Sequence, residues 1–224
     1  MGLDRLIDKM VLAKGKKAYG FKGSGWFGNY DLVDRKLPSY EPILDELKSH
    51  LSKERLKEPV LDLASGLGGQ ADYLEKLGIK TVRFDLSNDA LKNVQGNMWE
   101  LPFKSLTFAG VHVKDGLVHV LDKRKFVAEV TRVLVPGGVL CITSDLSKPP
   151  VLKNLANAMF SGSVYVSFDM DDLQTIAKDF DMRLIREHSW APEWGEADWY
   201  SDKRMRTVAF FKKKRINNFV LTGD

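Results

Sequence analysis

The chain has 224 residues, of which 44% are hydrophobic and 29% charged, and these proportions exclude a coiled coil, a collagen-like fibre and a disordered tail. Its formal net charge of +4 is concentrated in one basic segment, Lys203–Arg215, rather than spread over a face, so nucleic acid is not an expected partner. No apolar run approaches the roughly 20 residues that cross a bilayer, and one cysteine, Cys141, excludes an internal disulfide; we therefore expect a cytoplasmic location, no membrane partner and no metal.

The first 56 residues are expected to form N-terminal helices and a lid loop. Apolar residues at helical spacing predict a short amphipathic helix over Leu3–Ala13 and a second, capped helix over Ser39–Leu51. The stretch between them, Lys14–Pro38, is rich in glycine and aromatic residues and has neither period. A loop of this length in a compact domain is usually functional or mobile.

From Pro59 onward, short apolar runs alternate with amphipathic segments, which predicts a parallel sheet covered by helices on both faces. After Pro149, a helix over Asp171–Phe180 is followed by two strand-like runs with no helix between them, so these runs should pair as an antiparallel ribbon at the sheet edge. The expected strands are Val60–Ala64, Lys80–Leu86, Leu106–Val113, Val139–Ser144, Met182–Ser189 and Arg206–Lys212, and the expected helices of the alternating part are Gln70–Leu77, Asp89–Val94 and Lys123–Leu134.

A glycine-rich turn follows the first of these strands, at Gly66 and Gly68, and then opens a helix. Glycines let the backbone approach a ligand closely, and a helix N-terminus offers free N–H groups, so this turn predicts a cofactor site. The pattern also fits the dinucleotide fingerprint, and a tight turn without a ligand is the remaining alternative.

Residues that follow the next two strands fit the same site. Asp85 ends the second expected strand, 23 residues after Asp62, where a carboxylate can accept both hydroxyls of a ribose. Asn97 is suited to hydrogen-bond an adenine edge, and Met98 with Trp99 supplies apolar surface for a flat base.

Together these residues resemble the class I S-adenosylmethionine-dependent methyltransferases over roughly Pro59–Ser144. The resemblance implies an α/β fold with a seven-stranded, Rossmann-like, doubly wound sheet, mostly parallel, with an antiparallel C-terminal strand next to the fifth. The chain departs from the family pattern at Ala64, which replaces a glycine, and at Asn97, which replaces an aspartate. The cofactor is then S-adenosylmethionine, and the residues expected to bind it are Asp62, Ala64, Ser65, Gly66, Gly68, Asp85, Leu86, Asn97, Met98, Trp99 and Lys114.

On this interpretation residues 1–224 form a single methyltransferase domain, with a cofactor-binding core over 57–146 and an acceptor-side insertion and C-terminal hairpin over 147–224. A nicotinamide dehydrogenase would not need the terminal ribbon, and it rarely places an aspartate four residues before the first glycine.

The run Lys114–Val120 is similar to an Arg-Asp-x-x-x-His-Ile run of phosphoethanolamine methyltransferases. The similarity implies that Asp115 contacts the acceptor and that His119 acts as a base or orients the acceptor. A helix-capping or core role for His119 is the alternative. The lid loop adds the remaining candidates for acceptor binding, which are Tyr19, Trp26 and Tyr30.

We therefore expect methyl transfer to O or N of a small metabolite. Two alternatives stay open: an RNA or protein methyltransferase that uses Lys203–Arg215, and a non-catalytic regulator that binds the cofactor. The basic segment is also explained as a solvated edge strand, because lysines on an edge discourage aggregation. The sequence does not define the oligomeric state.

Overall fold

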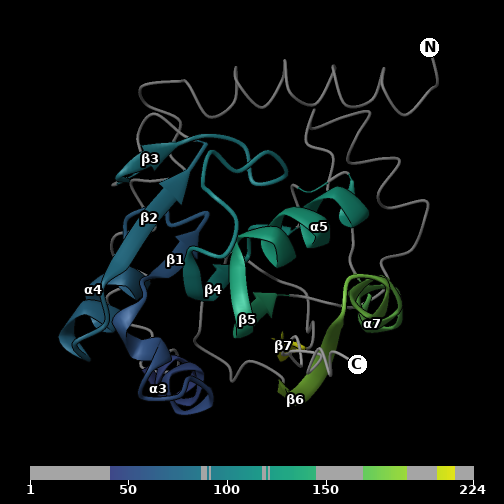
Figure 1. Ribbon diagram of the computed structural model, residues 1–224. Helices are drawn as coiled ribbons and strands as arrows, with labels where there is room; N and C mark the ends of the chain where they lie inside the picture. The colour runs from purple at the N-terminus through teal and green to yellow at the C-terminus, as the bar shows by residue number, and fades with distance from the viewer. Residues whose placement is uncertain are drawn as a thin grey trace, which may run out of the picture.

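The computed structural model describes residues 41–86, 90, 92–117, 120, 122–144, 169–190 and 206–214. These residues form a seven-stranded sheet with the order β3-β2-β1-β4-β5-β7-β6 (Figure 1). The strands are β1 (Val60–Leu63), β2 (Thr81–Asp85), β3 (Val94–Gln95), β4 (Phe108–Lys114), β5 (Leu134–Ser144), β6 (Met182–Trp190) and β7 (Arg206–Lys213). The described helices are α3 (Glu41–His50), η1 (Arg55–Lys57), α4 (Gly69–Lys76), α5 (Lys123–Val133) and α7 (Met170–Asp179).

The strands β1 to β5 run parallel to one another, whereas β7 runs antiparallel to both β5 and β6. This is the mostly parallel sheet with an antiparallel last strand that the family resemblance implied. The topology brings the carboxyl ends of β1, β2 and β4 to one edge of the sheet, and in open α/β sheets ligands bind at that edge. Among the described helices, none has the length and apolar character that a membrane span requires.

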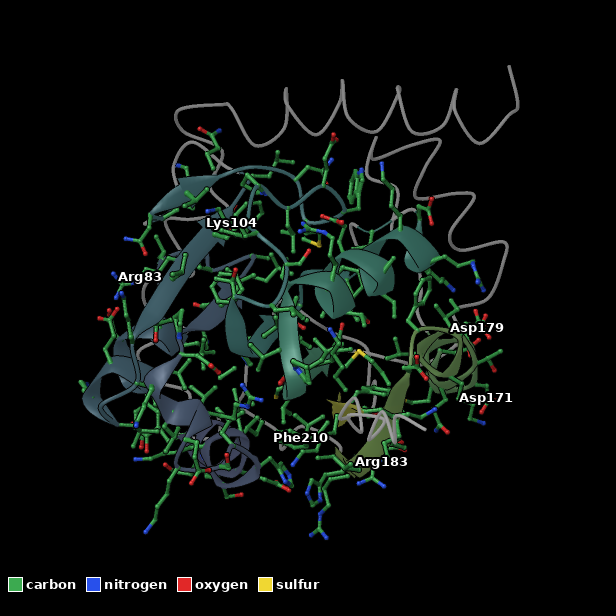
Figure 2. All side chains as sticks on the ribbon, viewed as in Figure 1. Arg83, Lys104, Asp171, Asp179, Arg183 and Phe210 are labelled. Carbon is green, nitrogen blue, oxygen red and sulfur yellow. The ribbon has the colours of Figure 1, made fainter. Side chains whose placement is uncertain are left out.

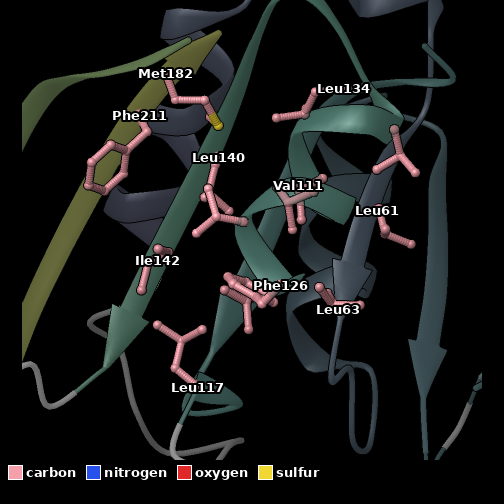
Figure 3. Close-up of a cluster of buried hydrophobic side chains, with 14 of the residues drawn as sticks. Leu61, Leu63, Val111, Leu117, Phe126, Leu134, Leu140, Ile142, Met182 and Phe211 are labelled. Atoms are coloured by element: carbon pink, nitrogen blue, oxygen red, sulfur yellow. The ribbon is translucent and has the colours of Figure 1, made fainter. Parts of the chain in front are cut away.

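Each face of the sheet packs against its own helices because alternate strand residues point to opposite faces. Leu61, Val111 and Leu140 lie on the face covered by α5 and α7, in the cluster drawn in Figure 3. Val60, Val139 and other strand residues of the opposite face pack against α3 and α4. In Figure 2, charged side chains such as Asp171 and Arg183 lie at the periphery.

The helix predicted over Asp89–Val94 is wrong at the residues that the structure describes. Val94 lies in β3, and Lys92 and Asn93 are not helical. The reason is pairing with β2: the Asn93 backbone N–H donates to the Arg83 carbonyl at 2.9 Å, and the Asn93 side chain accepts from the Arg83 N–H at 2.8 Å. Sheet pairing here overrides a short helical spacing. The helix predicted over Leu3–Ala13 and the lid loop lie outside the described residues.

The position of β7 corrects the interpretation of the basic segment as a solvated edge strand. β7 lies between β5 and β6, and β6 forms the edge of the sheet. Lys212 donates to the main-chain carbonyl of His50 at 3.2 Å, and Lys213 donates to that of Thr131 at 2.7 Å. Lys214 donates to the Asp181 carboxylate at 3.0 Å. Partial burial also lowers the pKa of Lys213. These lysines therefore fasten β7 to neighbouring elements.

Candidate active site

The turn between β1 and α4 has a left-handed backbone at alternate residues. The φ angles are 60° at Ala64, 51° at Gly66 and 81° at Gly68, and residues other than glycine rarely adopt such values. The Gly68 N–H donates to the Ser65 carbonyl at 2.8 Å, which closes the turn directly before α4 begins at Gly69. The turn therefore brings its backbone N–H groups and the N-terminus of α4 to one place.

Open space lies over two glycines of this turn. In the described part of the chain, a Cβ built on Gly66 or on Gly69 has no other heavy atom within 4 Å. Gly69 also has no positive φ, so neither its backbone nor its surroundings require a glycine there. Gly116 in the loop after β4 differs, because its Cβ would stand 2.8 Å from that of Ala64. One side of the turn is thus packed against the β4 loop, and the other leaves room for a ligand.

Asp85 lies against the turn, as the sequence predicted. Its Oδ2 accepts a hydrogen bond from the Gly66 N–H at 2.9 Å, and the Ser65 N–H donates to the Phe84 carbonyl at 3.1 Å. These two bonds join the ends of β1 and β2, so the carboxylate stands directly beside the glycines. Leu86 follows at the end of β2.

The segment predicted to hold a base is a tight turn after β3. The Asn97 side-chain oxygen accepts from the Trp99 N–H at 3.2 Å, and Asn97 forms an isolated bridge with Glu100. Met98 and Trp99 are partly buried against the core beneath α5. The amide oxygen of Asn97 therefore shapes this turn, and the two apolar side chains join it to the sheet.

Two residues of α5 hold the chain that follows this turn, and sequence analysis missed both. Arg132 donates to the carbonyls of Phe103 at 2.7 Å and Leu101 at 2.9 Å, and Glu129 accepts from the Leu101 N–H at 2.8 Å. Arg132 also donates to Glu129 at 2.7 Å, and this bond lowers the pKa of the Glu129 carboxyl group. A glutamate three residues before an arginine on a helix was the only signal in the sequence.

A buried pair connects β1 with β4. Asp62 Oδ1 lies 3.2 Å from His112 Nδ1, and the two side chains are 2% and 1% exposed. His112 is a packed residue of β4, and its contact with Asp62 is not visible in the sequence. Asp62 Oδ2, Ser65 Oγ and His112 Nε2 are buried and have no hydrogen-bond partner among the described residues.

These features fit an adenosyl amino acid. The open space over Gly66 and Gly69 admits a ligand close to the backbone. Asp85 is suited to accept hydroxyl hydrogen bonds, and buried polar atoms such as Asp62 Oδ2 and Ser65 Oγ need donors or acceptors that the described chain does not provide. The N-terminus of α4 favours a carboxylate group.

The acceptor side is described only in part. Lys114 ends β4, and Asp115 follows with a φ of 53° and an N–H that donates to the Thr143 carbonyl at 2.8 Å. The loop after β4 therefore leans on the end of β5. The other residues predicted to contact the acceptor lie outside the described residues, and they are Tyr19, Trp26, Tyr30 and His119.

Cys141 is expected to be unreactive in the folded protein. Its side chain is fully buried in β5, and burial raises the pKa of its thiol above the ordinary value. Because the thiolate is the nucleophile, a colourless disulfide reagent that releases a chromophore should show no reaction at about pH 8. In denaturant the same reagent should titrate one thiol per chain. Rapid reaction of the native protein would contradict the buried position.

Comparisons with known proteins find methyltransferases. A family model described as a methyltransferase domain matches residues 61–142. A demethylmenaquinone methyltransferase of Corynebacterium kroppenstedtii is 30% identical over 186 residues, which cover 78% of this chain and 71% of that protein. A protein of the same name from Clavibacter sepedonicus is 34% identical over 42% of this chain, and the match spans only 43% of that protein. A ubiquinone/menaquinone biosynthesis C-methyltransferase of Klebsiella pneumoniae is 33% identical over 57% of each chain.

Solved structures share the fold at lower identity. A methyltransferase from Bacillus halodurans superposes with a TM-score of 0.61 at 19% identity and covers 76% of this chain and 98% of its own. A phosphoethanolamine N-methyltransferase of Haemonchus contortus, solved with S-adenosylhomocysteine, gives 0.58 at 16% identity and covers 78% of this chain and 52% of its own. At these identities the two structures support the fold alone, over similar shares of this chain.

Proposed function

This chain belongs to the class I S-adenosylmethionine-dependent methyltransferases, and on that premise we propose that it methylates a ring carbon of a hydroquinone. The observation that carries the proposal is the 30% identity with a demethylmenaquinone methyltransferase, which extends over 78% of the chain. The sequence alone favoured O or N of a small metabolite as the acceptor atom. The names of the matched relatives favour carbon, and one of them specifies C-methyl transfer.

The glycine turn and the carboxylate beside it would hold the cofactor. In this proposal Asp85 accepts from the ribose hydroxyls, the turn of Asn97, Met98 and Trp99 borders the base, and the backbone at Gly66 lies along the nucleoside. When bound, S-adenosylmethionine supplies a methyl group activated by a positively charged sulfur. The contribution of the chain is then alignment, since an in-line displacement depends on the position of the attacking atom.

The loop after β4 would hold the acceptor. His119 takes a proton from a ring hydroxyl, and the resulting negative charge makes the neighbouring ring carbon a better nucleophile. The ring carbon would then take the methyl group of the bound donor, which would leave as a neutral thioether. His119 would return its proton to the ring oxygen while the proton of the methylated carbon passes to solvent, and aromaticity would be restored. Asp115 accepts a hydrogen bond from the second hydroxyl, which fixes the orientation of the ring.

The basic segment Lys203–Arg215 does not support a competing proposal in which the chain binds nucleic acid. Its described lysines, Lys212, Lys213 and Lys214, each donate to groups of this chain. A phosphate backbone would have to compete with those bonds.

The acceptor proposal is tested by supplying methyl-labelled S-adenosylmethionine with one of three acceptors: a short-chain demethylnaphthohydroquinone, a catechol or phosphoethanolamine. Mass spectrometry should find the label on a ring carbon of the naphthohydroquinone. His119→Ala should lower that turnover at least tenfold, given the 10²- to 10⁴-fold typical of general acid–base catalysis, while the dissociation constant for S-adenosylhomocysteine changes less than threefold. Label on oxygen or nitrogen alone would overturn the acceptor proposal. A smaller loss in His119→Ala would remove it as the base.

A further inference from the structure

The buried pair of Asp62 and His112 lies on the sheet face that packs against α3 and α4, and Arg83 of β2 is the other register partner of Asp62. Asp62 and His112 are register partners on β1 and β4, and the neighbouring partners are Val60 with Gly110. On the other side of His112 stands Cys141 of β5, which is also fully buried. A carboxylate in such a position is costly unless it is hydrogen-bonded or paired with a charge.

Within the pair, only one polar atom of each side chain has a hydrogen-bond partner among the described residues. His112 Nδ1 and Asp62 Oδ1 are 3.2 Å apart, and since an ionised carboxylate only accepts, the imidazole proton of this bond is on Nδ1. Asp62 Oδ2 remains buried without a partner in the described part of the chain. Asp62 stands two residues before Ala64, the first residue of the glycine turn with positive φ. The Oδ2 atom of Asp62 therefore lies close to the cofactor turn and has no donor in the described part of the chain.

We propose that His112 is a positioning residue, which holds Asp62 through Nδ1–H so that Oδ2 accepts from the α-ammonium group of the cofactor. The proposal rests on the assignment of S-adenosylmethionine and not on the identity of the acceptor. An imidazole suits this task because its Nδ1–H fixes one carboxylate oxygen by a single hydrogen bond and leaves the other oxygen to accept. A lysine or arginine at the same position would pair with the carboxylate as a full positive charge.

Two near-isosteric variants separate this role from simple packing. Asparagine has an amide nitrogen near the position of Nδ1, whereas leucine has the same shape and no donor. Calorimetry should use S-adenosylhomocysteine, which has the amino-acid end, and 5′-methylthioadenosine, which lacks it. His112→Leu should weaken the homocysteine ligand at least tenfold and change the methylthio ligand less than threefold. His112→Asn should bind both ligands within threefold of the wild-type protein.

A variant of Asp62, the other residue of the pair, provides a control for loss of folding. Asp62→Asn keeps the shape of the side chain and removes its charge, so it should show the same ligand selectivity as His112→Leu, and thermal unfolding without ligand confirms that each variant is folded. Equal losses for the two ligands, or equal behaviour of His112→Asn and His112→Leu, would overturn the positioning role. If the wild-type protein binds neither ligand, the cofactor assignment itself fails, which is a different result.

Discussion

Asp85→Ala is expected to weaken the binding of S-adenosylhomocysteine at least about 100-fold, because in the proposed site it removes two hydrogen bonds to a charged group, each contributing about 1.5–3 kcal/mol. In the structure the carboxylate also accepts from the Gly66 N–H at 2.9 Å. The substitution therefore removes the proposed ligand contact and a bond that shapes the turn. Asp85→Asn keeps an acceptor oxygen without the charge and should bind with intermediate strength.

Isothermal calorimetry measures the effect, and Asp171→Ala is the matched control. Asp171 is an exposed aspartate in the first turn of α7, at the periphery of the molecule in Figure 2. The control should bind like the wild-type protein. Binding by Asp85→Ala within threefold of wild type would show that the ribose contact is made elsewhere.

Gly69→Leu should separate stability from cofactor binding. Gly69 begins α4 with no positive φ and has open space around its Cβ position, and leucine has a higher helix propensity than glycine by up to about 0.8 kcal/mol. The protein without ligand should therefore be as stable as the wild type or slightly more stable. The same side chain would occupy the space assigned to the cofactor, and overpacking of about 1–3 kcal/mol predicts a loss of affinity of about 5- to 150-fold.

Gly78→Ala is the control, and it should show the opposite pattern of stability and cofactor affinity. Gly78 lies past the end of α4 with a φ of 80°, and nothing surrounds its Cβ position. Alanine there should lower the free energy of unfolding by about 1 kcal/mol because of the left-handed backbone and leave cofactor affinity unchanged. Chemical denaturation and calorimetry on the two variants give the comparison. Tight binding by Gly69→Leu would place the cofactor away from the N-terminus of α4.

The parts of the site that the sequence predicted are those whose residues are close in the chain or follow successive strands. The glycine turn directly follows β1, and Asp85 ends the next strand, so a parallel sheet necessarily brings them together. Contacts between distant residues were not predictable. Asp62 meets His112 only because β1 and β4 pair in one register, and periodicity gives no register.

The same limit explains the errors in the fold. The order of the last two strands was implied by the family resemblance, yet the lysines at the end of β7 were interpreted as part of a solvated edge strand because nothing local shows that β7 lies inside the sheet. The bonds from Arg132 to Leu101 and Phe103 join residues about 30 positions apart through main-chain carbonyls. Carbonyls are present at every residue, so composition does not reveal which of them will be bonded.

The placement of β7 between β5 and β6 has a consequence for biosynthesis. A ribosome releases β6 before β7, but β6 has no place beside β5 until β7 pairs with both. Val139 and Leu140 of β5 meet Lys212 and Phe211, so the nascent polypeptide must extend about 70 residues past β5 before that strand loses its exposed edge. The emerging chain therefore carries an unpaired strand edge until β7 has been synthesised, and a chaperone that shields such edges would have its opportunity during that interval.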